Sequence, residues 1–320
     1  MPYRVWPGTR AWNRTFLPSL LTLAFTADMP VTGLIPDTIV TLLAVATLFA
    51  VMFTLGSGVR ASDFRWTVRH PMVLAKGLFS VLVVAPAIAI TIARTLGVSR
   101  EAEVGIVLMS ICPGAPIAFQ RSMDAGAHRS FAPALQISLA LIAVVSMPLS
   151  IAALDEFYAG NASIEPQSVA KQVFVAQLLP MALGQIFRRA LPLLANRLMG
   201  HLQRLTKLLL LLLIVAVLID VLDVVIRAGS RISLAIAITT VLLLVVGQRL
   251  GGTDPSTQTA VAISSAMRNA GLALLVATAN AASPGITATV LAYVVVSALI
   301  VLPYVAWRRR RAMQATRPAP

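Results

Sequence analysis

Cysteine, histidine and charged residues are scarce in this chain of 320 residues. It has one cysteine, Cys112, and three histidines. A single thiol cannot form an internal disulfide, and the scarcity of thiols and imidazoles excludes multi-thiolate metal sites. Charged residues make up 12% of the chain, which is about half of their usual share in soluble domains. We therefore expect no metal site and no cofactor, and the low charge argues against a soluble protein.

Groups that could perform catalysis are missing from the long apolar stretches. A membrane-embedded enzyme needs converging His, Asp, Glu or Ser side chains, and the sequence has no such constellation and no metal-ligand spacing. Short segments of alternating polarity, which indicate a membrane β-barrel, are also absent. These absences predict a helical protein that is not an enzyme.

Apolar residues, in contrast, make up 58% of the chain, and the mean hydropathy is +0.85. Because a helical span needs roughly 20 apolar residues, the length predicts one integral membrane domain over 1–320 with about ten spans. The first span is interrupted by Pro18 and Asp28, so nine spans are the alternative. We place the spans at 15–34, 39–58, 71–93, 104–122, 130–153, 168–187, 206–226, 231–248, 256–281 and 285–306.

The net charge of +14 is distributed by loop in a way that indicates topology rather than nucleic-acid binding. Twenty basic residues fall on one side of the predicted spans and five on the other, and cytoplasmic loops carry such an excess. We therefore expect a multi-pass protein of the plasma (inner) membrane that contacts membrane lipids and has both termini in the cytoplasm. The richer side holds Arg4, Arg10, Arg14, Arg60, Arg65, Arg69, Lys76, Arg121, Arg129, Arg188, Arg189, Arg197, Arg204, Lys207, Arg249, Arg308, Arg309, Arg310, Arg311 and Arg317.

Two spans carry helix-weakening or polar residues near their centres. Span 104–122 contains two prolines, which lack a backbone donor and break the helical ladder, and span 256–281 contains serines, an arginine and an asparagine. Paired interruptions at corresponding positions indicate the binding site of a transporter built from inverted repeats. We predict a 5+5 repeat (15–153 and 168–306) with a cytoplasmic tail at 307–320. The candidate binding residues at the helix crossover are Cys112, Pro113, Gly114, Pro116, Gln136, Ser264, Arg268, Asn269 and Gly271.

The segments CPGAP at 112–116 and MRNAGLA at 267–273 resemble the two crossover signatures of the bile acid:sodium symporter family. The resemblance implies a core domain (spans 3 to 5 and 8 to 10), a panel domain (spans 1, 2, 6 and 7) and an organic anion bound between them. It further implies symport by alternating access. We expect a monomer or a homodimer.

The chain departs from this family at the sodium ligands. Where members that use sodium have oxygen-bearing side chains, the positions here are Ala118, Phe119, Ser264, Arg268, Gln136, Ala140 and Val81. Sodium is a hard cation that needs several oxygens. A guanidinium about 4 Å away would repel it by roughly 4 kcal/mol at an effective dielectric of 20. We therefore expect no sodium coupling.

Arg268 is the most costly side chain in these spans, because an arginine at the bilayer centre costs at least about 2.5 kcal/mol. Our hypothesis is that its fixed charge replaces the bound sodium ion and attracts an anionic substrate. The alternative is a structural arginine that bonds freed backbone carbonyls and never meets substrate. Gln136 has two interpretations as well, a site residue or a polar contact between helices.

Other functions remain open at this point. Asp220, in span 206–226, is explained either by snorkelling and pairing at the membrane interface or as a carboxylate that couples transport to protons. Cys112 permits an arsenite carrier, because a thiolate binds trivalent arsenic, and an arsenite- or auxin-type efflux carrier is the runner-up. A passive channel or a membrane sensor is the alternative of another class.

Overall fold

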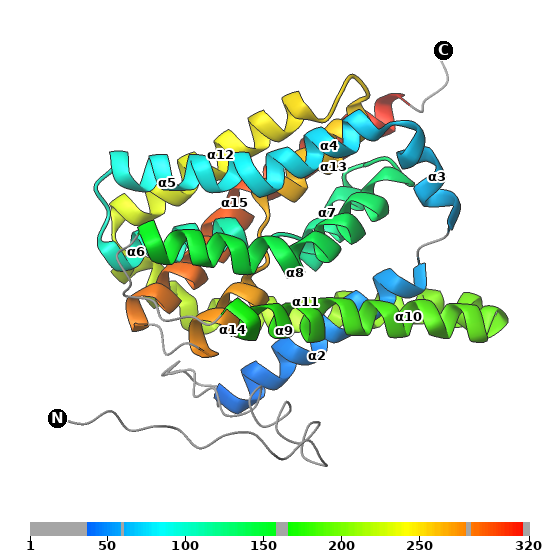
Figure 1. Cartoon of the computed structure of the whole chain (residues 1–320), viewed down its shortest axis with the longest axis horizontal. Coiled ribbons are helices and arrows are strands. Elements are labelled where there is room, and N and C mark those ends of the chain that lie inside the picture. The colour runs from blue at the N-terminus through cyan, green and yellow to red at the C-terminus, as the bar shows by residue number, and fades with distance from the viewer. Residues whose placement is uncertain (1–36, 59–60, 158–165, 280–282, 316–320) are drawn as a thin grey trace.

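The computed structural model describes residues 37–58, 61–157, 166–279 and 283–315, and every regular element in these ranges is helical. Labels follow Figure 1. The elements are α2 (Asp37–Gly58), α3 (Ala61–Arg69), α4 (Pro71–Phe79), η1 (Ser80–Val84), α5 (Ala85–Thr95), α6 (Arg100–Ile111), α7 (Pro116–Asp124), α8 (Phe131–Phe157), α9 (Pro166–Val173), η2 (Phe174–Leu178), α10 (Leu179–Ala190), α11 (Pro192–Ala228), α12 (Ser230–Leu250), α13 (Pro255–Ala266), α14 (Ala270–Ala279) and α15 (Pro284–Ala315).

Six segments of the described chain are long and apolar enough to cross a membrane. They are Pro71–Thr95, Phe131–Ala153, Gln167–Ala190, Ser230–Leu250, Pro255–Ala277 and Pro284–Gln314. This confirms an all-helical protein with several membrane-crossing segments. The predicted span 15–34 lies outside the described residues, so the count of ten and the inverted repeat stay predictions.

Helix α11 is longer than the span that we predict at 206–226, because it begins at Pro192. Proline suits the first turn of a helix, where its missing donor is not needed, and Leu191 is the only non-helical residue between α10 and α11. The helix therefore extends past the apolar stretch into a basic segment, where Arg197 and Arg204 are exposed.

Two short π-helical segments interrupt otherwise continuous helices, and each lies just before a proline. Pro86 follows η1, and Pro180 follows η2. A proline gives no hydrogen bond to the carbonyl four residues earlier. The backbone widens instead, and the N–H groups of Ala85 and Leu179 donate to carbonyls five residues back. Such π-bulges are frequent at functional sites, and both of these lie beside the candidate site described below.

Helices α2, α10 and α11 pack against one another on one side of the molecule (Figure 1). The contact between α2 and α10 depends on Gly56 and Gly184. A Cβ atom at Gly56 would lie 2.0 Å from the carbonyl oxygen of Met181, and one at Gly184 would lie 2.1 Å from that of Phe53. Small residues permit such close approach between membrane helices.

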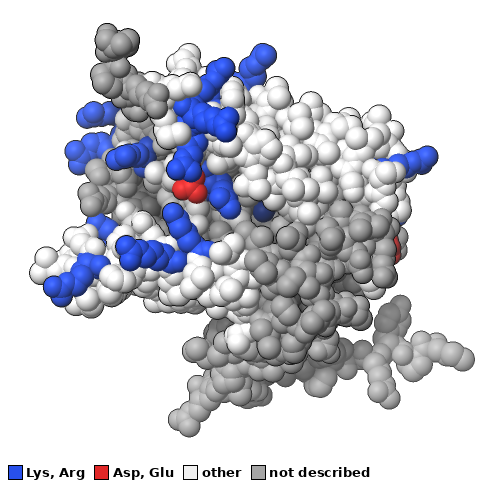
Figure 2. Space-filling model, turned by 180° about the vertical axis from the view of Figure 1, so that it is seen from behind, with Lys and Arg blue, Asp and Glu red and all other residues white. Residues whose placement is uncertain are grey.

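The basic residues gather toward one end of the molecule, as Figure 2 shows. The C-terminal end of α15 lies there, whereas the turn between α5 and α6 lies at the opposite end (Figure 1). The faces between the two ends carry uncharged residues on the described surface in view (Figure 2). This is the charge distribution that a membrane protein needs, with an apolar belt and a basic end.

Candidate functional site at the helix crossover

The first interruption separates α6 from α7. Residues Cys112 to Ala115 are not helical, and α7 begins at Pro116. Gly114 has a φ of +75°, a left-handed conformation that glycine adopts without a steric penalty. The prolines cannot donate within a ladder, so the chain turns here instead of continuing as one helix.

The second interruption lies between α13, which ends at Ala266, and α14, which begins at Ala270. No proline enforces it. Instead, the side-chain oxygen of Asn269 accepts the Leu272 N–H at 3.1 Å, which caps the first turn of α14. The Asn269 N–H donates to the Cys112 carbonyl at 3.0 Å. This bond joins the two interruptions directly, and we call residues 112–115 and 267–269 the crossover.

Arg268 lies at the centre of the crossover, and only 5% of its surface is exposed. Its guanidinium donates to backbone carbonyls of three helical segments. Nε reaches the Met109 carbonyl at 3.3 Å and Nη1 reaches that of Ser265 at 3.5 Å. Nη2 donates to the Val81 carbonyl at 3.1 Å and also to that of Ser110. The charge therefore faces carbonyl oxygens inside the protein and not lipid.

The acceptors of Arg268 are placed by helix ends and by a π-bulge. Met109 and Ser110 lie in the last turn of α6, Ser265 lies in the last turn of α13, and Val81 belongs to η1. The C-terminal end of a helix carries partial negative charge and stabilises a cation. Helices α7 and α14 begin on the other side of the same breaks, and their N-terminal ends favour an anion. One cation and one anion site can therefore adjoin at the crossover.

Two buried glutamines lie beside Gly114. Gln136 of α8 is 1% exposed and Gln177 of η2 is 0% exposed, and none of their side-chain amide atoms has a hydrogen-bond partner among the described residues. A Cβ at Gly114 would lie 3.3 Å from Gln177 Oε1 and 3.6 Å from Gln136 Nε2. The side-chain nitrogen of Asn269 lacks a partner in the same described part of the chain. Buried amides are costly unless they are satisfied, so this cluster is suited to a polar ligand.

The other predicted site residues have different surroundings. Ser264 is buried in α13, whereas Gly271 is exposed in the first turn of α14. A Cβ at Gly271 would meet only ordinary van der Waals contacts, so packing at this position does not require a glycine. The backbone of Pro116 starts α7, and the side chains of Pro116 and Asp220 lie outside the described part of the structure.

Sequence reasoning missed several members of this site. The Met109, Ser110 and Ser265 carbonyls accept hydrogen bonds through the backbone, so no side-chain pattern marks them. Val81 was noted only as a position without the family's sodium ligand, and the role of its carbonyl was missed. Gln177 did leave a signal, because it is a polar residue within the apolar stretch VFVAQLLP. Ser80, whose hydroxyl lies 2.8 Å from that of Ser265, was missed as well.

Among the described residues, no group of three or more His, Cys, Asp or Glu side chains could hold a metal ion. Cys112 is a fully buried free thiol. The site is therefore made of a guanidinium, amides, hydroxyls and helix ends.

A helical chain with several membrane-crossing segments and a polar crossover inside them is a multi-pass integral membrane protein. The profile of the Sodium Bile acid symporter family matches residues 45–228, more than half of the chain, so the protein belongs to that family. Its members are transporters and not enzymes, and this confirms the resemblance seen in the sequence.

Two relatives are similar to this chain. One is the probable sodium/metabolite cotransporter BASS2, chloroplastic, of Oryza sativa subsp. japonica, which is 23% identical over 73% of this chain. The match spans 56% of the rice protein's length. The other is the uncharacterized sodium-dependent transporter YocS of Bacillus subtilis (strain 168), which is 24% identical over 72% of each chain.

Proposed function

We propose that this protein is a secondary active transporter of a small organic anion in which Arg268 takes the place of the coupling sodium ion. The observation that carries the proposal is the set of carbonyl oxygens around the guanidinium, from the ends of α6 and α13 and from η1. Broken-helix ends and unwound carbonyls are the groups that coordinate sodium in transporters of this architecture.

A guanidinium in this position makes sodium binding unfavourable in two ways. It uses the carbonyl oxygens that a hard cation would need. It also repels a second cation nearby, because like charges at about 4 Å cost roughly 4 kcal/mol at an effective dielectric of 20. The arginine remains attached to the protein throughout the cycle, so it provides positive charge without an ion gradient.

The anion site lies on the other side of the breaks in this proposal. The N-terminal ends of α7 and α14 attract negative charge, and the amides of Gln136 and Gln177 supply donors and acceptors beside Gly114. Gln136 lies on α8 and Gln177 on η2, which the family resemblance assigns to the core and the panel. An anion between them would contact both units, as alternating access by a 5+5 repeat requires.

The basic end of the molecule supports a topology in which this end faces the cytoplasm and the protein lies in the plasma (inner) membrane.

For the driving force we propose protons, with Asp220 as the titrating group. Asp220→Asn should then lose the dependence of uptake on a pH gradient, and full retention of that dependence would remove Asp220 from the mechanism.

The proposed function is tested by uptake of radiolabelled small carboxylates into liposomes that contain the purified protein. A carrier saturates and is accelerated by unlabelled anion on the opposite side, whereas a channel shows neither property. Arsenite is tested as a second solute, because Cys112 permits the alternative function of an arsenite carrier. Flux without saturation or counterflow would contradict the proposal, and so would arsenite transport that excludes every carboxylate.

The two glutamines give a prediction with opposite effects on stability and transport. Gln136→Leu and Gln177→Leu each remove a buried amide without a partner, which costs about 1–3 kcal/mol, so the melting temperature should rise. Uptake should fall about tenfold or more, because a hydrogen bond to a charged ligand contributes about 1.5–3 kcal/mol. Both quantities are measured on the same purified protein.

Gln185→Leu is the matched control, since its side-chain oxygen also lacks a partner in the described part of the chain but it lies on α10, away from Gly114. This variant should keep its uptake. Unchanged uptake in both Gln136→Leu and Gln177→Leu would show that the pair does not bind the anion.

A further inference from the structure

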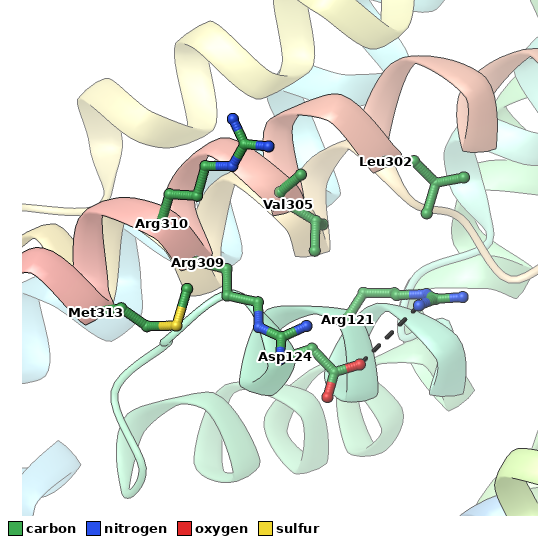
Figure 3. A pocket seen from close by; sticks show the side chains of 8 residues that line it. Arg121, Asp124, Leu302, Val305, Arg309, Arg310 and Met313 are labelled. Atoms are coloured by element: carbon green, nitrogen blue, oxygen red, sulfur yellow. Dashed lines mark ion pairs between the residues drawn. The ribbon is translucent and has the colours of Figure 1, made fainter.

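A second concave site lies at the basic end of the molecule, away from the crossover. It is an open pocket of about 350 Å³ between α7 and the end of α15 (Figure 3), a volume within the usual range for small ligands. Arg121 and Asp124 of α7 line one side. Residues of α15 line the other, namely Leu302, Val305, Ala306, Arg309, Arg310 and Met313.

This pocket has an excess of positive charge. It holds three arginines and one carboxylate, and among these described residues a single ion pair forms, between Arg121 Nη1 and Asp124 Oδ2 at 4.0 Å. Within the described residues, no carboxylate lies within 4.0 Å of Arg309 or Arg310. Figure 3 shows the guanidinium of Arg309 on the side of α15 that faces α7 and that of Arg310 on the opposite side of the helix, so Arg309 is the group available to an anion between α7 and α15.

The four consecutive arginines of α15 are not equivalent. Arg308 is 7% exposed, and it donates to the Thr259 hydroxyl at 2.7 Å and to the Pro255 carbonyl. Arg311 lies over the Trp307 ring, 4.5 Å from its centroid. Arg309 and Arg310, both exposed, line the pocket instead. Arginines that only set the orientation of the protein in the membrane would not need these different environments.

Apolar side chains adjoin the cations in this pocket. Leu302 is 45% exposed and Val305 is buried, and both line the pocket. Arginine forks bind phosphate in a bidentate manner, and basic pockets between membrane helices bind the head groups of anionic lipids. We propose that this pocket binds an anionic membrane phospholipid. The phosphate would lie between Arg309 and Arg121, with Arg310 adding positive charge nearby, and the glycerol and acyl portion would lie along Leu302 and Val305.

The position of the pocket gives such a lipid a consequence for the transporter. Helix α7 follows the first break directly, and the turn after it packs tightly on α15, since a Cβ at Gly126 would lie 2.7 Å from that of Ala312. A head group that contacts Arg121 on α7 and Arg309 on α15 would join the two helices. The bound lipid therefore stabilises the placement of α7 at the crossover.

The test is a lipid titration of the purified full-length protein in detergent, with thermal unfolding as the readout. Phosphatidylglycerol should raise the melting temperature at concentrations where phosphatidylcholine with the same acyl chains does not. For Arg309→Gln/Arg310→Gln, the half-saturating concentration should rise about 30-fold, since each arginine near an anionic lipid contributes about 1 kcal/mol. Inorganic phosphate and glycerol 3-phosphate are titrated in parallel.

Two further variants decide what the result means. Arg197→Gln/Arg204→Gln removes the same charge from exposed positions of α11 and should titrate like the wild type. Arg309→Lys/Arg310→Lys keeps the charge that sets topology but loses the bidentate fork, so it should weaken lipid binding while the protein still folds and inserts. The proposal fails if phosphatidylcholine acts equally, if both glutamine pairs have the same effect, or if phosphate alone reproduces the shift.

Discussion

Replacing Arg268 with glutamine is expected to lower anion uptake by about 30- to 100-fold, because at an effective dielectric of 20 a unit charge 6–8 Å from a substrate anion contributes about 2–3 kcal/mol. Glutamine can still donate to one or two of the carbonyls now bonded by the guanidinium. The substitution therefore removes the charge more completely than it removes the hydrogen bonds. Uptake into liposomes and the melting temperature are measured together.

Arg268→Lys is the matched variant, because it keeps the charge and loses the fork geometry. If charge at the crossover attracts the substrate, the lysine variant should retain uptake within about tenfold of the wild type, far above the glutamine variant. If the arginine only bonds carbonyls, the two variants should lose uptake to the same extent as they lose stability. Full activity in the glutamine variant would refute the role of Arg268.

Placing alanine at Gly56 should cause the largest loss of stability among single-methyl changes. The added Cβ would lie 2.0 Å from the Met181 carbonyl oxygen, so the backbones of α2 and α10 must separate. Overpacking costs typically about 1–3 kcal/mol and more where backbone must move. We expect a melting temperature lowered by several degrees or a protein that does not accumulate, together with loss of uptake.

Gly200→Ala is the control for this change. Gly200 lies inside α11, is exposed, and would bring its Cβ within 4 Å of nothing among the described residues. Alanine there should be neutral or stabilising by about 0.5–1 kcal/mol, since glycine is the poorer helix former. An equal response of the two variants would mean that the α2–α10 contact does not set the stability.

The sequence predicted the helices well because apolar length is a strong signal. The predicted spans within the described residues coincide with helical structure apart from the two breaks at 112–115 and 267–269, and the first break follows from the missing donors of two prolines. The break at Arg268 was harder to predict, because it depends on an Asn269 cap and on a hydrogen bond to Cys112, far away in the sequence.

The site was predicted only in part, for a physical reason. Hydropathy and polar side chains identified Arg268, Asn269 and Gln136 as candidates, but no residue pattern encodes which carbonyls the guanidinium reaches. Those carbonyls are available to the guanidinium because they lie at helix ends or in η1, a π-bulge that depends on Pro86. Gln177 comes next to Gly114 through packing between helices distant in sequence, which a single sequence does not reveal.

The proposal that Arg268 replaces sodium is tested most directly by uptake with and without sodium. Initial rates of anion uptake into liposomes are compared with external sodium chloride, potassium chloride and choline chloride, at matched membrane potential and pH. The account predicts equal rates in the three salts and no ²²Na⁺ accumulation coupled to the anion. Uptake that requires sodium and rises steeply with its concentration would contradict it.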